Sequence, residues 1–433
     1  MLSPRALVPA FLFLSLPLMA EELGDSLKWN FQARMRGELR NNVYDFDSDA
    51  KALTDDSWLL HRFRLGVEWQ PLEWLRFTVQ GQDVRESFSD RPDVPLLNGA
   101  EGDDAFDLRL ASIEFGNANK LSLKLGRQVL AYGDERLVGP LEWLNFSRTF
   151  DAVKFHLEHE GWWLDAFTSS VVRYHESEFN RSDWLGNSDG TGQFFSGIYY
   201  SNTSVLRFQT TDLYAFHLHQ ESSSGGSDFI TLGTRWKGDP LLLDGWDYTA
   251  EFAGQSGRVR GKELGAYAHH LEAGYNWLKQ SWKPRIAMEY SFGTGDDNAA
   301  DGNVHTFQNL FPTNHPPYGF MDTFSWQNMH NVAFRLAAQP HPKFKAALDL
   351  HSFWLSTSND AWYRANGITQ VRDIQPGASR HAGYELDLTL NAKLSQRLDL
   401  LLGYSHFFAG DYLADTGASS DADFAYLTLT FNY

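Results

Sequence analysis

Apolar and polar residues alternate at every second position along much of this 433-residue chain. The pattern is clearest at its end, where residues 425–433 read AYLTLTFNY. Successive side chains of a β-strand point to opposite faces, so such a segment has one apolar and one wettable face. When an apolar face meets lipid and a wettable face meets water, the pattern is typical of a membrane-spanning β-barrel.

The same alternation recurs along the chain, clearly over residues 27–40, 62–69, 75–80, 285–292 and 385–393. Short turns are predicted near 70–74, 117–120, 159–162, 201–205, 238–245, 278–283, 339–343 and 395–397. Longer links are predicted near 41–57, 87–104, 132–147, 174–193, 221–227, 257–262, 296–326, 356–380 and 410–420. The fold class predicted from this order is all-β: a transmembrane antiparallel barrel of about 18 strands, an even number as in bacterial barrels. A count of 16 is the alternative, because residues 174–210 are hard to divide into strands.

Composition agrees with a chain that would cross a membrane with strands. No segment approaches the ~18 consecutive apolar residues of a membrane helix. The 55 acidic and 37 basic residues give a formal net charge of -18, which argues against nucleic acid as a partner. The chain has no cysteine, so disulfides and thiol ligands are excluded.

The first 20 residues resemble a secretory signal peptide. One cation, Arg5, precedes an apolar run from Ala6 to Met19, and a small residue, Ala20, follows. We therefore expect residues 1–20 to be a signal peptide and residues 21–433 to form the barrel. Export combined with a barrel pattern predicts the outer membrane of a bacterial-type cell as the location.

Tryptophan positions agree with the predicted turns. Nine tryptophans lie near the short-turn, periplasmic ends of the expected strands: Trp29, Trp69, Trp74, Trp162, Trp163, Trp236, Trp246, Trp277 and Trp282. Indole prefers the boundary between lipid and water, so we expect an aromatic girdle there. The alternative is the tryptophan of an ordinary soluble core.

Arginines dominate the wettable face of the first strands. Arg34, Arg36, Arg62 and Arg64 are predicted to face the lumen. If the first hairpin is symmetric about its loop, Arg36 lies opposite Arg62 and Arg34 opposite Arg64. Guanidinium groups bind carboxylates bidentately, so the cluster would suit an anionic or polyhydroxylated solute in a wet channel. The alternative is that inward carboxylates of other strands, such as Asp151, Glu251, Glu289 and Asp387, pair with these arginines.

Several short motifs resemble the alginate export family of outer-membrane porins. They are GRQ at 126–128, YGDERLVG at 132–139, RTFDAV at 148–153, GTGD at 293–296, ELD at 385–387, GYS at 403–405 and FAGD at 408–411. The resemblance implies an 18-stranded barrel with an arginine-lined lumen that passes anionic polysaccharide. It makes Arg127, Arg136 and Arg148 lumen candidates, with Asp134 and Asp151 as their partners. The alternative is that Gly133, Asp134 and Arg136 only shape a loop that folds into the barrel.

Other chemistry has weaker support. Ser405 and His406 are adjacent and so face opposite ways on a strand, which does not suit a serine hydrolase. His217, His219 and Glu221 share one face and are the nearest approach to a zinc set, but nothing else marks a site there, and a lumen-facing polar row is the simpler interpretation. Residues 296–303 are oxygen-rich, but their spacing does not match an EF-hand loop, so calcium binding there is left open.

The sequence therefore predicts a passive outer-membrane channel for anionic or uronic-acid-like saccharides, with no enzymatic activity, cofactor or metal. Loops 132–147 and 296–326 are expected to narrow the pore. The expected partners are outer-membrane lipid, an anionic saccharide solute and, through the C-terminal strand, the barrel-assembly machinery. A periplasmic partner is possible but its nature is unknown. The alternatives are a general or differently selective small-solute porin and, with less support, a barrel enzyme or a purely structural barrel.

Overall fold

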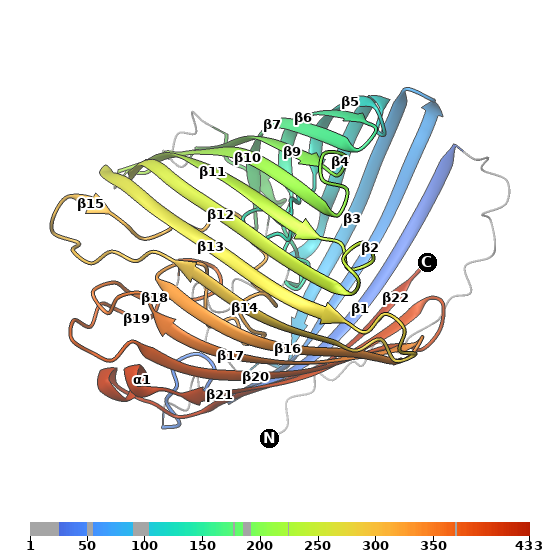
Figure 1. Ribbon diagram of the computed structural model, residues 1–433. Helices are drawn as coiled ribbons and strands as arrows, with labels where there is room; N and C mark the ends of the chain where they lie inside the picture. Colours follow the sequence, from blue (N-terminus) through green and yellow to red (C-terminus); the bar gives the residue numbers. More distant parts are fainter. Residues whose placement is uncertain are drawn as a thin grey trace, which may run out of the picture.

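A computed structural model describes residues 26–49, 55–89, 104–175, 178–184, 192–223, 225–368 and 370–433. The expected signal peptide, residues 1–20, lies outside these ranges. The fold is an all-β cylinder whose strands are inclined to its axis (Figure 1). Within the described part of the chain, the one helix is α1 (Asp411–Thr416), and no helix is long and apolar enough to cross a membrane.

Eighteen long strands form the wall of the barrel. They are β1 (Leu27–Asn41), β2 (Asp55–Leu72), β3 (Leu75–Ser87), β4 (Asp104–Asn117), β5 (Leu121–Gln128), β6 (Phe150–His159), β7 (Trp162–Arg173), β9 (Gln193–Asn202), β10 (Gln209–Gln220), β11 (Ser227–Gly238), β12 (Trp246–Val259), β13 (Lys262–Asn276), β14 (Arg285–Gly293), β16 (Met329–His341), β17 (Phe344–Leu355), β20 (His381–Lys393), β21 (Leu398–Ala409) and β22 (Ala422–Asn432). Four short strands lie in the long loops: β8 (Arg181–Ser182), β15 (Asn303–Val304), β18 (Trp362–Tyr363) and β19 (Gln370–Arg372).

The barrel closes between its first and last strands. Each wall strand pairs antiparallel with the next, and β22 pairs with β1 from Asp423↔Asn41 to Asn432↔Gln32. The main chains of Phe31 and Tyr433 exchange two further hydrogen bonds, of 3.0 and 2.8 Å. The predicted count of 18 is therefore confirmed against the alternative of 16.

The two faces of the wall have the predicted chemistry. On β1 the outward side chain of Leu39 is 61% exposed, whereas the inward side chain of Arg36 is fully buried in the lumen. The same contrast on β13 places Tyr267 and Leu271 outside and His270 inside. Alternation in the sequence thus separates a lipid-facing surface from a lumen that holds the charged groups.

The connections follow the predicted order with one exception. All eight predicted short turns join strands at one end of the barrel, for example residues 73–74 between β2 and β3. At the other end, the link predicted as long at 257–262 is a two-residue turn, Arg260–Gly261, between β12 and β13. Both residues have positive φ. β12 and β13 therefore continue farther toward the long-loop end of the barrel than predicted.

The register of the first hairpin differs from the prediction by two residues. Arg62 lies opposite Arg34 rather than Arg36, Arg36 lies opposite Leu60, and Arg64 lies opposite Gln32. The ladder continues to Asn41↔Asp55, so the connecting loop is centred one residue earlier than a symmetric division of the sequence indicates. All four arginines still face the lumen because a shift of two preserves the face.

Most of the predicted tryptophan girdle faces outward at the short-turn end. Trp29, Trp69, Trp74, Trp246, Trp277 and Trp282 are exposed on the outer surface. Trp163 is the exception, because it packs inside the barrel on Tyr132 and Tyr199. Its neighbour Trp162 takes the other face, as two adjacent strand residues must.

Candidate functional site

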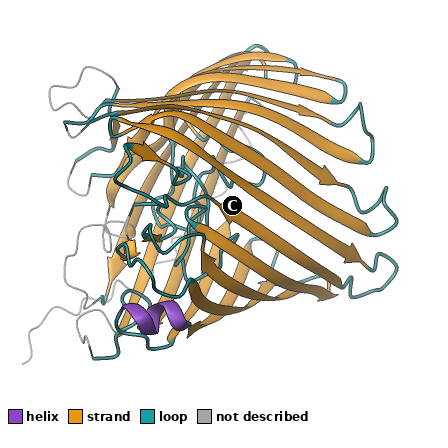
Figure 2. Cartoon of the chain, turned by 60° about the vertical axis from the view of Figure 1, so that its left-hand side comes forward, coloured by secondary structure: helices purple, strands orange, loops and turns teal. Residues whose placement is uncertain are grey.

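Two long loops fold into the barrel and meet there. They are residues 129–149, between β5 and β6, and residues 294–328, between β14 and β16. Their backbones are joined by hydrogen bonds from Gly139 N to Phe311 O and from Phe311 N to Leu137 O, both of 2.8 Å. Figure 2 shows loop backbone inside the ring of strands. The prediction that these loops narrow the pore is consistent with this arrangement.

Tyr132 fixes the start of the first loop to the wall. Its ring stacks on Tyr199 at 4.7 Å and on Phe167 at 5.6 Å between centroids, and its hydroxyl donates to Asp165 Oδ2 at 3.0 Å. The next residue, Gly133, has φ of +59°, and a Cβ there would lie 3.1 Å from the Tyr199 hydroxyl. The turn therefore needs glycine, and the aromatic stack holds it against the wall.

The middle of the loop lies on arginines of β1, β2 and β4. The Glu142 carboxylate accepts from Arg64 Nη1 at 2.8 Å and from Arg109 Nη2 at 2.5 Å, and Arg62 Nη1 lies 3.3 Å away. Arg34 donates to the backbone oxygens of Glu142 and Leu144 at 2.8 and 3.2 Å. The like charges of this cluster are thus compensated by a loop carboxylate and by carbonyl oxygens.

These contacts set the charge of Glu142. Burial raises the pKa of its carboxyl group, but the guanidinium groups of Arg64, Arg62 and Arg109 outweigh burial and lower the pKa to about 2. Glu142 is therefore an anion throughout the physiological pH range, and 41% of its side chain is still exposed to the lumen.

Arg36 has a different environment from the other three arginines of the predicted cluster. Its Nε lies 2.6 Å from Glu38 Oε1, its guanidinium lies 4.0 Å above the Trp143 ring, and it donates to Trp143 O. Both ionic side chains are fully buried. Arg36 thus packs the loop against β1, with a carboxylate of its own strand as its partner.

Asp134 is held by cations of the opposite wall. Arg235 donates to both of its carboxylate oxygens at 3.0 and 2.7 Å, and Lys237 Nζ lies 2.7 Å away. Burial raises the pKa of Asp134, but the hydrogen bonds and charge of Arg235 dominate and lower it. Arg136 lies 3.4 Å from Asp134 and contacts His270 Nε2 at 2.7 Å, so the expected Arg136–Asp134 pair is present but secondary.

The remaining candidates divide between the wall and the loops. Arg127 and Asp151 form the expected pair across β5 and β6, at 2.9 and 3.2 Å. Arg148 instead donates to the carbonyl oxygens of Gly139 and Pro312, both at 3.0 Å, and joins the two inward loops. Burial lowers the pKa of Arg148 to about 10.

Three residues that organise this site were not predicted from the sequence. Glu142 and Arg109 complete the arginine cluster, and Arg235 is the principal partner of Asp134. The inward carboxylates considered as partners of the arginines do not fill that role, because the loop supplies Glu142 instead. Arg109 and Arg235 alternate with apolar neighbours, so the sequence does indicate strands there. No local pattern, however, connects Glu142 to Arg34, Arg62 and Arg64, which lie about 80–110 positions away in the sequence.

A cavity of about 720 Å³ lies below the loop, toward the short-turn end. Its lining includes six cationic side chains, from Arg34, Arg36, Arg62, Lys343, Lys345 and Lys393, and two anionic ones, from Glu142 and Asp399. The arginines belong to β1 and β2, whereas the lysines belong to β17, β20 and the turn before β17. Cations from separate strands thus converge on one water-accessible space.

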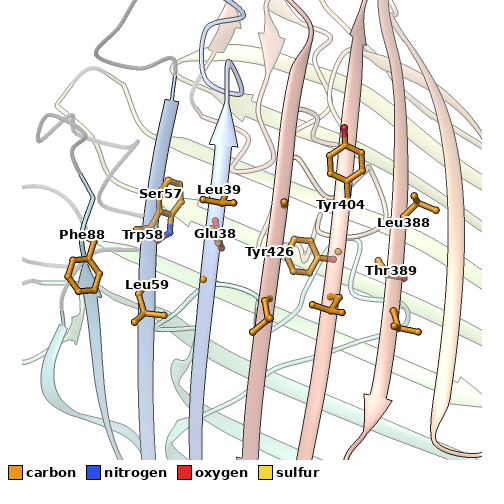
Figure 3. A pocket seen from close by; sticks show the side chains of 16 residues that line it. Glu38, Leu39, Ser57, Trp58, Leu59, Phe88, Leu388, Thr389, Tyr404 and Tyr426 are labelled. Atoms are coloured by element: carbon orange, nitrogen blue, oxygen red, sulfur yellow. The ribbon is translucent and has the colours of Figure 1, made fainter. Parts of the chain in front are cut away.

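A second hollow, of about 740 Å³, lies on the outer surface and not in the lumen (Figure 3). Leu39, Leu59, Leu388 and Tyr404 surround it on β1, β2, β20 and β21. It opens toward lipid because these side chains point outward, and its floor includes Gly37 and Ala425. This hollow is therefore separate from the path of a solute.

The described residues contain no group of three or more His, Cys, Asp or Glu side chains that could hold a metal ion. His217 and His219 lie on the outward face of β10, where both imidazoles contact Asp228, at 3.0 and 2.7 Å. The interpretation of these histidines as a lumen-facing row was wrong. The reason is the phase of β10, which turns Tyr214, Phe216 and Leu218 into the barrel.

Comparison with known proteins identifies the family. The sequence profile described as "Alginate export" matches residues 25–426. The chain belongs to the alginate export family. No curated protein sequence matches the chain.

Solved structures confirm the fold. Pseudomonas aeruginosa OpdG aligns with a TM-score of 0.64 and 14% identity over 94% of this chain and 98% of its own. P. aeruginosa OpdF in complex with glucuronate gives 0.61 and 12% over 94% and 97%, and P. aeruginosa OpdP gives 0.59 and 12% over 94% and 91%. This alginate export family protein is therefore an outer-membrane porin, located in the outer membrane. Its family and structural neighbours are channels rather than enzymes, as the sequence indicated.

The stacking of Tyr132 can be tested by Tyr132→Ala. Loss of a buried aromatic ring costs about 3–5 kcal/mol, which should free the start of loop 129–149. We expect a larger and noisier single-channel conductance in planar bilayers. The control is Tyr132→Phe, which keeps the ring and loses one hydrogen bond of about 1 kcal/mol. An unchanged conductance in Tyr132→Ala would show that this anchor does not hold the loop.

Proposed function

We propose that this porin passes carboxylated, uronic-acid-like saccharides by passive diffusion through the lumen. The arginine cluster formed by Arg34, Arg62, Arg64 and Arg109, together with the basic cavity below it, attracts the solute and sets the anion preference. Arg36, Arg127, Asp134, Arg136, Arg148 and Asp151 serve this path mainly by holding the inward loops and the wall in place.

The carboxylate of Glu142 is the observation that supports this proposal most directly. It lies between Arg64 and Arg109 with the geometry that a bound carboxylate would take, and it is partly open to the lumen. A cluster that binds one carboxylate with charge-assisted hydrogen bonds can exchange it for another. Sugar carboxylates would then compete with Glu142 for the same guanidinium groups.

The basic cavity provides the continuation of the path. Six cations against two anions raise the local concentration of anions, because a narrow lumen with low-dielectric walls focuses the field. Lys343, Lys345 and Lys393 face the arginines from the other side of this space. A multi-site path of moderate attraction suits conduction better than one tight site.

The glucuronate complex of OpdF supports the choice of substrate class. That protein binds a uronate, and it shares the barrel fold with this chain at 12% identity. In this chain, a uronate would be bound by the cations of the lumen described above.

A general small-solute porin is the second candidate. Several lumen cations are neutralised by fixed partners, as in the Arg127–Asp151 and Arg235–Asp134 pairs. If such pairing extended to every cation on the path, the channel would show little preference for anions. Selectivity measurements distinguish the two candidates.

The substitutions Lys343→Gln, Lys345→Gln and Lys393→Gln test the proposal together. They remove three charges from the cavity, so the chloride-to-potassium permeability ratio should fall roughly 2–5-fold. Reversal potentials in salt gradients measure the ratio, and oligouronate should block the wild-type current more strongly than the variant current. Lys279→Gln with Lys283→Gln, in the turn after β13, is the control and should leave both values unchanged. Equal selectivity in all three proteins would favour the general porin.

The charge of Glu142 leads to a pH prediction. Its folded-state pKa of about 2 lies below the ordinary value of 4.5, so its ion pairs stabilise the loop fully above pH 4.5 and are lost only as pH falls toward 2. Glu142 should therefore contribute no change of selectivity between pH 7 and 5. Glu142→Gln should raise the anion preference over that range and increase current noise. A change of selectivity between pH 7 and 5 that is present in the wild type and absent from Glu142→Gln would contradict this assignment.

We further infer that residues 1–20 direct export and are removed, and that β22 with Tyr433 is the segment recognised by the barrel-assembly machinery. The apolar run after Arg5 supports the first inference, and the terminal aromatic of an alternating strand supports the second. N-terminal sequencing of the mature protein should begin at Glu21. Tyr433→Ser should reduce the amount assembled in the outer membrane, measured against Tyr404→Ser as a control on the same surface.

A further inference from the structure

The two rims of the barrel differ in chemistry. The outer surface at the short-turn end carries the tryptophan girdle, with His159 and His341 as its histidines among the described residues. Toward the long-loop end, the outward face carries His217, His219, His330, His381 and His406, whereas the outward histidines His61 on β2 and His269 on β13 lie farther from the strand ends. Indole thus dominates one rim and imidazole the other.

Three of these histidines form one continuous row with aromatic residues. Direct cross-strand partners run from β12 to β20 as Phe252, His269, Phe292, His330, Trp354 and His381. All six lie on the lipid-facing side, and aromatic rings alternate with imidazoles at every step. We call this set the imidazole row.

The rings of the imidazole row contact one another. Phe292 lies 5.2 Å from His269 and 4.8 Å from His330, and Trp354 lies 5.5 Å from His381. The Tyr290 hydroxyl, on the same surface, lies 2.8 Å from His330 Nδ1. Ring contacts thus join Phe252 through to His330 and Trp354 to His381, and the two groups meet where His330 and Trp354 are cross-strand partners.

The histidines of the imidazole row have different charged neighbours from His217, His219 and His406. His217 and His219 contact Asp228, and His406 contacts Asp423 at 2.8 Å. Within the described ranges, no carboxylate lies within ion-pair distance of His269, His330 or His381. Arg380, next to His381, adds a permanent positive charge beside the row. This surface therefore favours an anion from outside the protein.

We propose that the imidazole row binds the phosphorylated sugar headgroup of an outer-leaflet glycolipid. Imidazole N–H groups donate to phosphate oxygens, and protonation adds charge to these bonds. The intervening Phe and Trp rings present apolar faces to the C–H groups of the sugar. His330, Trp354 and His381 stand at the long-loop ends of β16, β17 and β20, where aromatic side chains meet lipid headgroups. Trp354 and Arg380 extend the same surface. This function is independent of what passes through the lumen.

The test uses the full-length porin and purified lipid A as the probe. His269→Gln, His330→Gln and His381→Gln are combined in one variant, and His159→Gln with His341→Gln is the matched control at the opposite rim. Lipid A that stays bound after detergent extraction is measured by native mass spectrometry over a range of lipid concentrations. Three lost charge-assisted hydrogen bonds should weaken binding by the triple variant at least about tenfold, and the control should bind like wild type.

Two further lipids test which headgroup is bound. Dephosphorylated lipid A and phosphatidylglycerol should each bind wild type at least about tenfold more weakly than lipid A does. If either of these lipids binds as tightly as lipid A, the assignment to a phosphorylated glycolipid is overturned. Undiminished lipid A binding by the triple variant, or an equal loss of binding in the control variant, would also overturn it. Heat-modifiable migration on gels verifies that each barrel is folded. If the triple variant does not assemble, His330→Gln alone replaces it and is expected to weaken lipid A binding several-fold. Reversal potentials should be the same in all variants, which separates this inference from the proposed transport function.

Discussion

The structure depends on the closure of the sheet between β1 and β22. Hydrocarbon offers no hydrogen-bond partner, so every backbone N–H and C=O group in the membrane must pair with a neighbouring strand. An open sheet of 18 strands would leave two unpaired edges, and the ladder from Asn41 to Gln32 removes both. Closure also creates an inside and an outside, and this division determines where each charged residue must go.

The lumen has to balance the charges that closure places inside it. The wall of β1–β4 brings Arg34, Arg62, Arg64 and Arg109 together, and like charges on one face repel unless something neutralises them. Loop 129–149 provides that compensation with Glu142 and its backbone oxygens. The feature that narrows the pore is thus also the feature that makes the arginine cluster stable, so transport and folding share the same contacts.

The outer surface of the barrel has different side chains at its two ends. Its apolar middle is required by lipid, but its rims are not required to be alike. Tryptophan side chains dominate one end, and the imidazole row reaches the other, so the two ends present different side-chain chemistry to lipid headgroups. The lipid-facing hollow beside Leu39 and Tyr404 lies on the same surface and plays no part in the channel.

The sequence by itself determined the barrel, the eight short turns and the inward direction of the arginines, because each of these follows from period-two alternation and local turn chemistry. It favoured 18 strands, but only the structure excluded 16, since residues 174–210 do not divide clearly into strands. It did not determine the register of the first hairpin, since a loop without a period gives no sign of how its residues divide between two strands. It also did not show that Trp163 turns inward or that His217 and His219 turn outward, because the alternation there is ambiguous in phase. The partners of Arg64 and Arg235 were decided only by the tertiary structure. Glu142 and Asp134 are about 80–100 residues away in sequence, and only the inward path of one loop brings these carboxylates to them.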